Sequence, residues 1–145
     1  MVAVANAKAE SFTFNSIANG ATKSEFFTNS NKVRILNMTV VSEAAIAAHA
    51  SNVYKVELLS GATVLGRITN DSDESDTTAV TGTVGIDSAL YAAKTTRSLA
   101  FTQAGANSDG AYENAGDAVL EIKASNDTGG TITDVTVHLE YTVSD

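Results

Sequence analysis

The chain contains no cysteine, no proline and no tryptophan, and it has only two methionines. Without cysteine there are no disulfides, no thiolate metal sites and no cysteine nucleophiles. Without proline every turn is built from Gly, Asn, Asp and Ser, and no X-Pro isomerisation slows folding. Little in such a chain is easily oxidised, which would suit a long-lived extracellular particle but would also arise by chance.

Positive charge is also scarce. Nine Lys and Arg stand against 17 Asp and Glu, so the formal net charge is −8 and the pI is about 4.6. The basic residues are scattered, whereas binding to phosphate backbones depends on clusters of them. We therefore expect neither nucleic acid nor a membrane as a partner. The excess negative charge favours solubility and mutual repulsion between copies.

Long apolar runs are missing as well. No stretch is long enough to span a membrane, and the opening MVAVANAKAE has no charged leader before a signal-like apolar core. At 145 residues, with 43% hydrophobic and 18% charged residues, the chain has the size and composition of one globular domain. The sequence thus predicts a soluble protein made in a cytoplasm.

Several stretches alternate apolar and polar residues, as half-buried strands do. The pattern is clear at 11–17 and clearest at 117–125 and 134–143. These last two stretches predict an antiparallel pair with one buried face, joined by a turn over 126–133. The apolar positions expected on that face are Ala118, Leu120, Ile122, Val135, Val137, Leu139, Tyr141 and Val143.

The middle of the chain supplies further strands. Residues 32–41 are rich in β-branched side chains and apolar on both faces, which predicts a strand in the middle of a sandwich. Its two expected faces are Leu36, Met38 and Val40 on one side and Val33, Ile35 and Val41 on the other. Residues 52–69 predict a hairpin that turns at Ser60-Gly61-Ala62. Residues 78–85 alternate weakly, and 97–103 predict a short strand.

Seven or eight strands, one short helix and no βαβ rhythm predict an all-β, antiparallel β-sandwich. The helix is expected over 42–50, an Ala-rich stretch with Ser42 as its N-cap. Long excursions such as the turn-rich loop at 104–117 favour a jelly roll or Greek key over a meander. Residues 1–10 are expected to form a flexible arm before a single domain over 11–145.

The acidic stretch NDSDESDTT, residues 70–78, is the most metal-like part of the chain. An EF-hand loop that starts at Asp71 needs Gly at its sixth position and Glu at its twelfth, but the chain has Asp76 and Gly82 there. Asp71, Asp73 and Asp76 remain candidate calcium ligands. Because clustered carboxylates usually face water, the preferred interpretation is a solvated loop with no metal and no cofactor.

No catalytic constellation stands out, so we do not expect an enzyme. His49 and His138 lie far apart and outside any metal-ligand spacing, and His138 falls in the polar phase of its strand. Glu57 and Glu121 are expected to be exposed, which argues against a glycosidase pair. A Ser-His-Asp arrangement stays open because its geometry cannot be read from sequence. The sequons at Asn37, Asn70 and Asn126 mean little without a secretory signal.

Aromatic residues are few. Tyr91 and Tyr112 are the candidates for a stacking platform in a sugar-binding module, although they share no spacing. The dipeptide Phe26-Phe27 is expected to anchor the core or an interface.

The closing sequence DAVLEIKASNDTGGTITDVTVHLEYTVSD lies in an acidic chain rich in Ala, Thr, Asn and Gly. In this it resembles the small jelly-roll capsid decoration (cement) proteins of tailed bacteriophages, and less closely head-fibre or tail-associated domains. The resemblance covers residues 30–145 and is strongest at 117–145. It is one of composition and closing hairpin, so no family binding residue can be placed on this chain. Such proteins are monomers or trimers that brace adjacent coat subunits from outside.

The resemblance implies a non-enzymatic virion protein on the capsid surface, with the major capsid protein and its own copies, in a homotrimer, as partners. Residues 2–9 would then extend along a neighbour. The alternative is a carbohydrate-binding jelly roll on a head fibre or tail that uses Tyr91 or Tyr112, with or without calcium at 71–76. A hydrolase ranks last.

Overall fold

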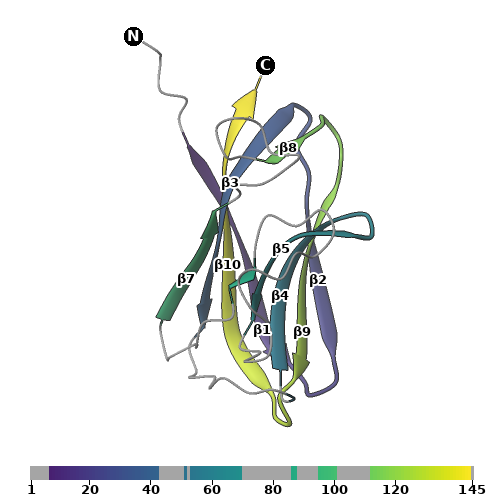
Figure 1. The fold of residues 1–145 in the computed structure, drawn as a ribbon, viewed down its shortest axis with the longest axis vertical. Coiled ribbons are helices and arrows are strands. Elements are labelled where there is room, and N and C mark those ends of the chain that lie inside the picture. Colours follow the sequence, from purple (N-terminus) through teal and green to yellow (C-terminus); the bar gives the residue numbers. More distant parts are fainter. Residues whose placement is uncertain are drawn as a thin grey trace.

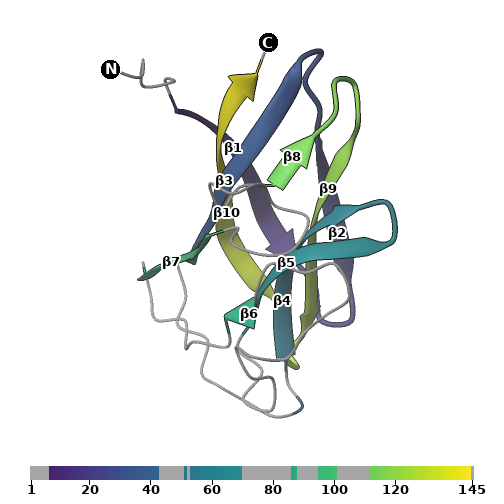
Figure 2. The same ribbon diagram turned by 45° about the horizontal axis from the view of Figure 1, so that its top comes forward.

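The computed structural model describes residues 7–42, 51, 53–69, 86–87, 95–100 and 112–144, and it builds two facing sheets from them (Figure 1 and Figure 2). The first sheet has the order β1-β10-β3-β7, with β8 also paired to β3, and the second has the order β2-β9-β4-β5-β6. The strands are β1 (Lys8–Ile17), β2 (Thr22–Phe27), β3 (Lys32–Ser42), β4 (Val53–Ser60), β5 (Thr63–Thr69), β6 (Ile86–Asp87), β7 (Thr95–Ala100), β8 (Tyr112–Asn114), β9 (Leu120–Asp127) and β10 (Ile132–Ser144).

The strand pairing is nested. Leaving aside the short β6 and β8, the first strand pairs with the last, the second with the second last, and so on inward: β1 with β10, β2 with β9, β3 with β7 and β4 with β5. Two further pairings, β10 with β3 and β9 with β4, join these four strand pairs into the two sheets. All six pairings are antiparallel, and together they give the jelly-roll order. The predicted all-β sandwich of jelly-roll type is therefore confirmed.

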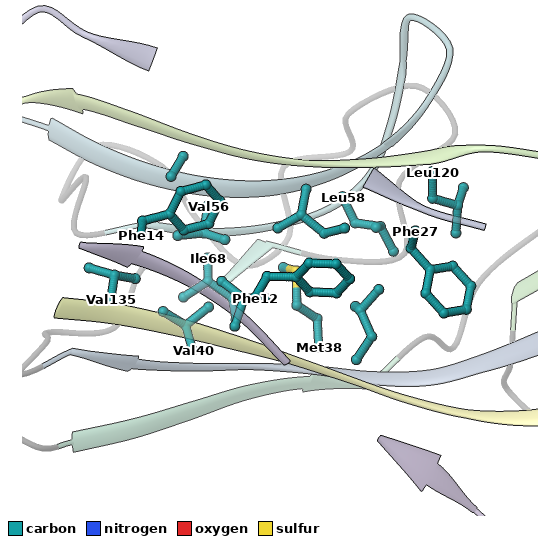
Figure 3. Close-up of a cluster of buried hydrophobic side chains, with 14 of the residues drawn as sticks. Phe12, Phe14, Phe27, Met38, Val40, Val56, Leu58, Ile68, Leu120 and Val135 are labelled. Atoms are coloured by element: carbon teal, nitrogen blue, oxygen red, sulfur yellow. The ribbon is translucent and has the colours of Figure 1, made fainter. Parts of the chain in front are cut away.

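One hydrophobic core fills the space between the sheets (Figure 3). Both sheets contribute side chains from alternate positions, because successive residues of a strand point to opposite faces. The rings of Phe27 and Tyr141 meet edge to face across the core, with centroids 5.0 Å apart. The inward alternation predicted for the last two strands is confirmed for Leu120, Ile122, Val135, Val137, Leu139 and Tyr141, which are all buried.

The prediction that these last two strands pair with each other is wrong. β9 lies between β2 and β4 in the second sheet, whereas β10 lies between β1 and β3 in the first. The connection over 128–131 thus crosses from one sheet to the other and is not a hairpin turn. Alternation shows that each strand has one buried face, but two strands on opposite sides of one core have the same pattern.

A β-bulge in β3 corrects a second expectation. Ile35 pairs with Tyr141 and Asn37 with Glu140, so Leu36 is an extra residue without a partner in β10. The extra residue reverses the phase of the strand. Val33, Ile35, Met38 and Val40 therefore all point into the core, although the sequence pattern placed them on two faces.

The other predicted elements agree with the structure only in part. The hairpin over 52–69 is confirmed as β4 and β5. Strand β2 was not predicted, because TKSEFF is mostly exposed and polar. The sheet begins at Lys8, inside the range assigned to the arm. Ser42, the expected helix N-cap, ends β3, and the rest of that helix lies outside the described residues. Within the described ranges no helix is long and apolar enough to cross a membrane.

Candidate functional site

Cross-strand register lines up four side chains on the outer face of the second sheet: Ser24, Lys123, Glu57 and Arg67, from β2, β9, β4 and β5 in turn. Arg67 Nε lies 2.9 Å and Nη2 lies 2.8 Å from Oε2 of Glu57. The side chains of Glu57 and Arg67 are only 10% and 14% exposed. Glu57 has the outward phase that was predicted, but the expectation that it is exposed is wrong. The sequence could have indicated this ion pair, because a hairpin that turns at Gly61 brings residues 57 and 67 close together.

The same outer face carries an exposed apolar pair at one end. Phe26 is 61% exposed and Val119 is 53% exposed, and these are the large exposed hydrophobic residues of the described part of the chain. Phe26 pairs with Glu121, so Val119 is its diagonal neighbour across the two strands. Glu121 accepts a hydrogen bond from Ser24 and is half-buried. The two residues of the dipeptide Phe26-Phe27 therefore differ in burial: Phe27 lies in the core and Phe26 faces solvent.

The outer face of the first sheet is polar. Ser11, His138 and Thr39 lie in one cross-strand row, and Ser11 Oγ is hydrogen-bonded to His138 Nδ1 at 2.6 Å. In the next row, Asn37 Nδ2 donates to Glu140 Oε1 at 3.4 Å. His138 is therefore on the outward face, as predicted. The described residues place a serine beside a histidine, but no carboxylate is hydrogen-bonded to that ring, so the three parts of a triad are not brought together there.

Two hollows open beside β2. The larger, about 390 Å³, lies near the turn from β1 to β2 and is lined by Gly20, Ala21, Thr22, Val53, Lys55, Ser125, Asn126 and Asp127. The smaller, about 310 Å³, lies between the edge strands of the two sheets and is lined by Thr13, Phe14, Asn15, Lys23, Ser24 and Glu25. Both combine ammonium, carboxylate and hydroxyl or amide groups, which suits polar ligands better than apolar ones.

The wall of the larger hollow is held by Asn126, which is 2% exposed. Its Nδ2 donates to the carbonyls of Ile17 and Gly130, both at 2.7 Å, and its Oδ1 accepts from the amide and hydroxyl of Thr128. Its backbone bonds the neighbouring β1–β2 turn, since Gly20 N donates to Asn126 O and Asn126 N donates to Ala21 O. The amide nitrogen of this sequon is thus buried and fully engaged, and it cannot accept a glycan while the chain is folded.

Several of the predicted site residues lie outside the described part of the chain. The candidate calcium ligands Asp71, Asp73 and Asp76 lie outside the described residues, as do His49 and Tyr91. Tyr112 begins β8, but its side chain is not described. Within the described ranges, no three His, Asp or Glu side chains gather in a way that could hold a metal ion.

No protein-family model matches the chain, and no curated protein matches it. Among solved structures, the chain is similar to a chain in the structure of infectious bursal disease virus Gx strain, with a TM-score of 0.34 and 11% identity. The alignment covers 94% of this chain and 32% of that one, so this chain spans about a third of the viral chain. The fold assignment accordingly rests on the strand pairing.

Proposed function

We propose that the chain is a non-enzymatic structural protein of a virion and that it decorates the outer surface of a phage capsid. The observation that carries the proposal is the nested pairing of eight strands into a jelly roll. Viral capsid proteins, lectins and cupins are the main users of this architecture. Because a fold hosts several functions, the choice among the three depends on the residues that each of them needs.

The interior argues against a cupin. A cupin-type site would place metal-ligating side chains between the two sheets, but the described residues that fill this space are aliphatic and aromatic side chains and Met38. His138 points to the outer face of the first sheet and is hydrogen-bonded to Ser11. The packed interior favours a rigid block whose function lies on its surface.

The surface is compatible with many copies on one shell. Both outer faces carry hydroxyl, amide and charged side chains, and the net charge of −8 favours solubility. The exposed pair Phe26 and Val119 offers a small apolar contact within this polar surface. The resemblance to decoration proteins supports this role by its composition only, because β9 and β10 lie in different sheets and do not form a closing hairpin.

The test is binding of the purified full chain to shells of the virus that encodes it. We expect saturable binding to expanded shells, with a raised melting temperature of the shell, and no binding to shells already fully occupied. Lack of binding to both immature and expanded shells would contradict the proposal.

One observation favours a second function, the binding of a carbohydrate. The hollow of about 390 Å³ is lined by Thr22, Lys55, Ser125 and Asp127, which together supply the donors and acceptors that sugar hydroxyls need. A glycan array probed with the full chain, with and without a calcium chelator, tests this function. Specific glycan binding without shell binding would favour it over decoration.

A further inference from the structure

Strand β2 forms an edge of the second sheet (Figure 1). It pairs with β9 along one side, and within the described part of the chain no strand pairs with its other side. An open edge presents unpaired backbone N–H and C=O groups, which can add another strand. Edge β2 is short, six residues, and it carries two charges: Lys23 and Glu25.

These two charges point toward the inner side of the sheet. Lys23 pairs with Ala124 and Glu25 with Ile122, both of which are buried in the core layer, yet Lys23 and Glu25 are exposed because the sandwich is open at this edge. The ion pairs of the described residues, Lys32–Glu113 and Arg67–Glu57, do not involve them. Inward-pointing charges at an edge normally oppose strand addition, because an incoming strand would bury them.

The order of Lys23 and Glu25 in β2 removes this obstacle when the incoming strand is β2 of a second copy of the chain. When two copies of β2 are placed antiparallel about a two-fold axis at Ser24, each residue n faces residue 48 minus n of the other copy. Lys23 then faces Glu25 of the second copy, and Glu25 faces Lys23, so the same two charges attract. Opposite charges directly across an antiparallel pair stabilise it, and like charges destabilise it. Phe26 faces Thr22 of the second copy in this register and becomes partly covered.

The neighbouring edge strand fits the same axis. The hollow of about 310 Å³ is lined by residues 13–15 of β1 and 23–25 of β2, so the centre of the β2 pairing lies beside Phe14. An axis that runs through both places brings Thr13 opposite Asn15 of the second copy. No like charges meet in β1, because its charged residues, Lys8 and Glu10, lie outside this overlap. The two ion pairs would lie in the hollow between the sheets, where partial exclusion of water strengthens them.

We propose that two copies of this chain associate edge to edge through β2, with a two-fold axis at Ser24 and reciprocal Lys23–Glu25 ion pairs. The two second sheets then form one continuous sheet, and the interface is isologous, as two-fold symmetry requires. The proposed assembly is a dimer with two-fold symmetry, so it differs from the homotrimer that the resemblance to decoration proteins implies.

A charge swap tests the proposal directly. The mass of the full chain is measured by sedimentation equilibrium over a concentration series, for the wild type, Lys23→Glu, Glu25→Lys and the double variant. Each single variant places like charges opposite each other twice, and we expect the dimer Kd to rise about tenfold or more. The double variant restores both opposite-charge pairs in reversed order, and we expect its Kd within about threefold of the wild type.

Matched controls separate this interface from general charge effects. Glu140→Lys makes the same change in net charge as Glu25→Lys, but on a central strand of the first sheet, and it should leave the Kd within about twofold. Thermal unfolding of each variant confirms that it is folded. In the dimer, backbone amides of β2 should also exchange with deuterium more slowly as the protein concentration rises.

Three outcomes would overturn the proposal. The first is a wild-type chain that stays monomeric at every concentration, which would mean that Lys23 and Glu25 only protect the edge. The second is a trimer or other assembly whose stability does not change in the single variants. The third is a double variant that associates as weakly as the single ones, since a direct pairing of the two charges predicts its recovery.

Discussion

Arg67 and Glu57 form an ion pair on the outer face of a sheet, yet both side chains are nearly buried. Two guanidinium nitrogens converge on one carboxylate oxygen, a charge-assisted arrangement that is stronger than a neutral hydrogen bond. Across the sheet Glu57 also faces Lys123. The pair therefore joins β4 to β5 at a place where either charge alone would be poorly solvated.

Replacing Arg67 by Met should destabilise the protein, because the nearly buried carboxylate of Glu57 loses its main partner. We expect the free energy of unfolding to fall by about 2–4 kcal/mol, measured by urea denaturation. The control is Lys32→Met, which removes the exposed pair with Glu113, where the side chains are 52% and 41% exposed. That loss should stay below about 1 kcal/mol. Equal losses in the two variants would contradict the argument.

The hydroxyl of Tyr54 gives a pH dependence whose sign can be worked out. Burial raises the pKa of Tyr54 above its ordinary value of 10.0, since ionisation would place a charge in the core. Above that value the unfolded chain releases a proton that the folded chain keeps. The contribution of Tyr54 to the free energy of unfolding is therefore fully present below pH 10. Above pH 10 it decreases by about 1.4 kcal/mol per pH unit.

Denaturation of the wild type and of Tyr54→Phe between neutral pH and strong alkali measures this effect. The slope above pH 10 should be steeper in the wild type, because the variant lacks the titrating group while the other tyrosines are common to both. Parallel slopes would show that Tyr54 ionises in the folded protein as it does in water.

Asn126 should be the most costly asparagine to truncate among those described. Asn126→Ala removes donors from the carbonyls of Ile17 and Gly130 and an acceptor from Thr128, all at the junction of two turns. We expect a loss of about 2–3 kcal/mol in the free energy of unfolding. Asn37→Ala is the matched control, because its single bond to Glu140 is exposed and long, 3.4 Å, and its loss should be within about 0.5 kcal/mol. A larger loss at Asn37 would refute this ranking.

Gly116 is required by close backbone packing. A Cβ at this position would lie 2.6 Å from the carbonyl oxygen of Ser30, whereas one at Gly130 would meet nothing within 4 Å. Gly116→Ala should therefore lower the free energy of unfolding by about 1–3 kcal/mol. Gly130→Ala should be neutral or slightly stabilising, since it restricts only the unfolded chain. Urea midpoints of the two variants decide the matter, and equal midpoints would show that the Ser30 loop moves aside.

Much of the fold could be predicted from alternation and turn residues. The strands around Phe12, Val56 and Val137 follow from period-2 patterns, and the hairpin of β4 and β5 follows from its glycine turn. Strand β2 could not be found, because an edge strand with an exposed outer face needs few apolar residues. The partners of β9 and β10 were also beyond reach, since alternation records burial and not the neighbour across the ladder.

The surface features depended on register, which the sequence fixes only weakly. Glu57 has the outward phase, but its near burial results from Arg67 and the packing around it. The phase change at Leu36 comes from a single extra residue that pairs with nothing in β10. Lys23 and Glu25 indicate an interface only once β2 is known to be an edge strand, because opposite charges two residues apart are common on exposed strands.

The nested pairing also determines when the molecule can fold. Lys8 pairs with Tyr141 and Ile17 with Ile132, so β1 finds its partner more than a hundred residues later in the chain. Such distant contacts give a high contact order and slow folding. During synthesis β3 can pair with β7, but β1 and the other side of β3 have no partner until β10 emerges from the ribosome. Production of this chain should therefore benefit from slow, cool expression, and loss of β10 should abolish folding altogether.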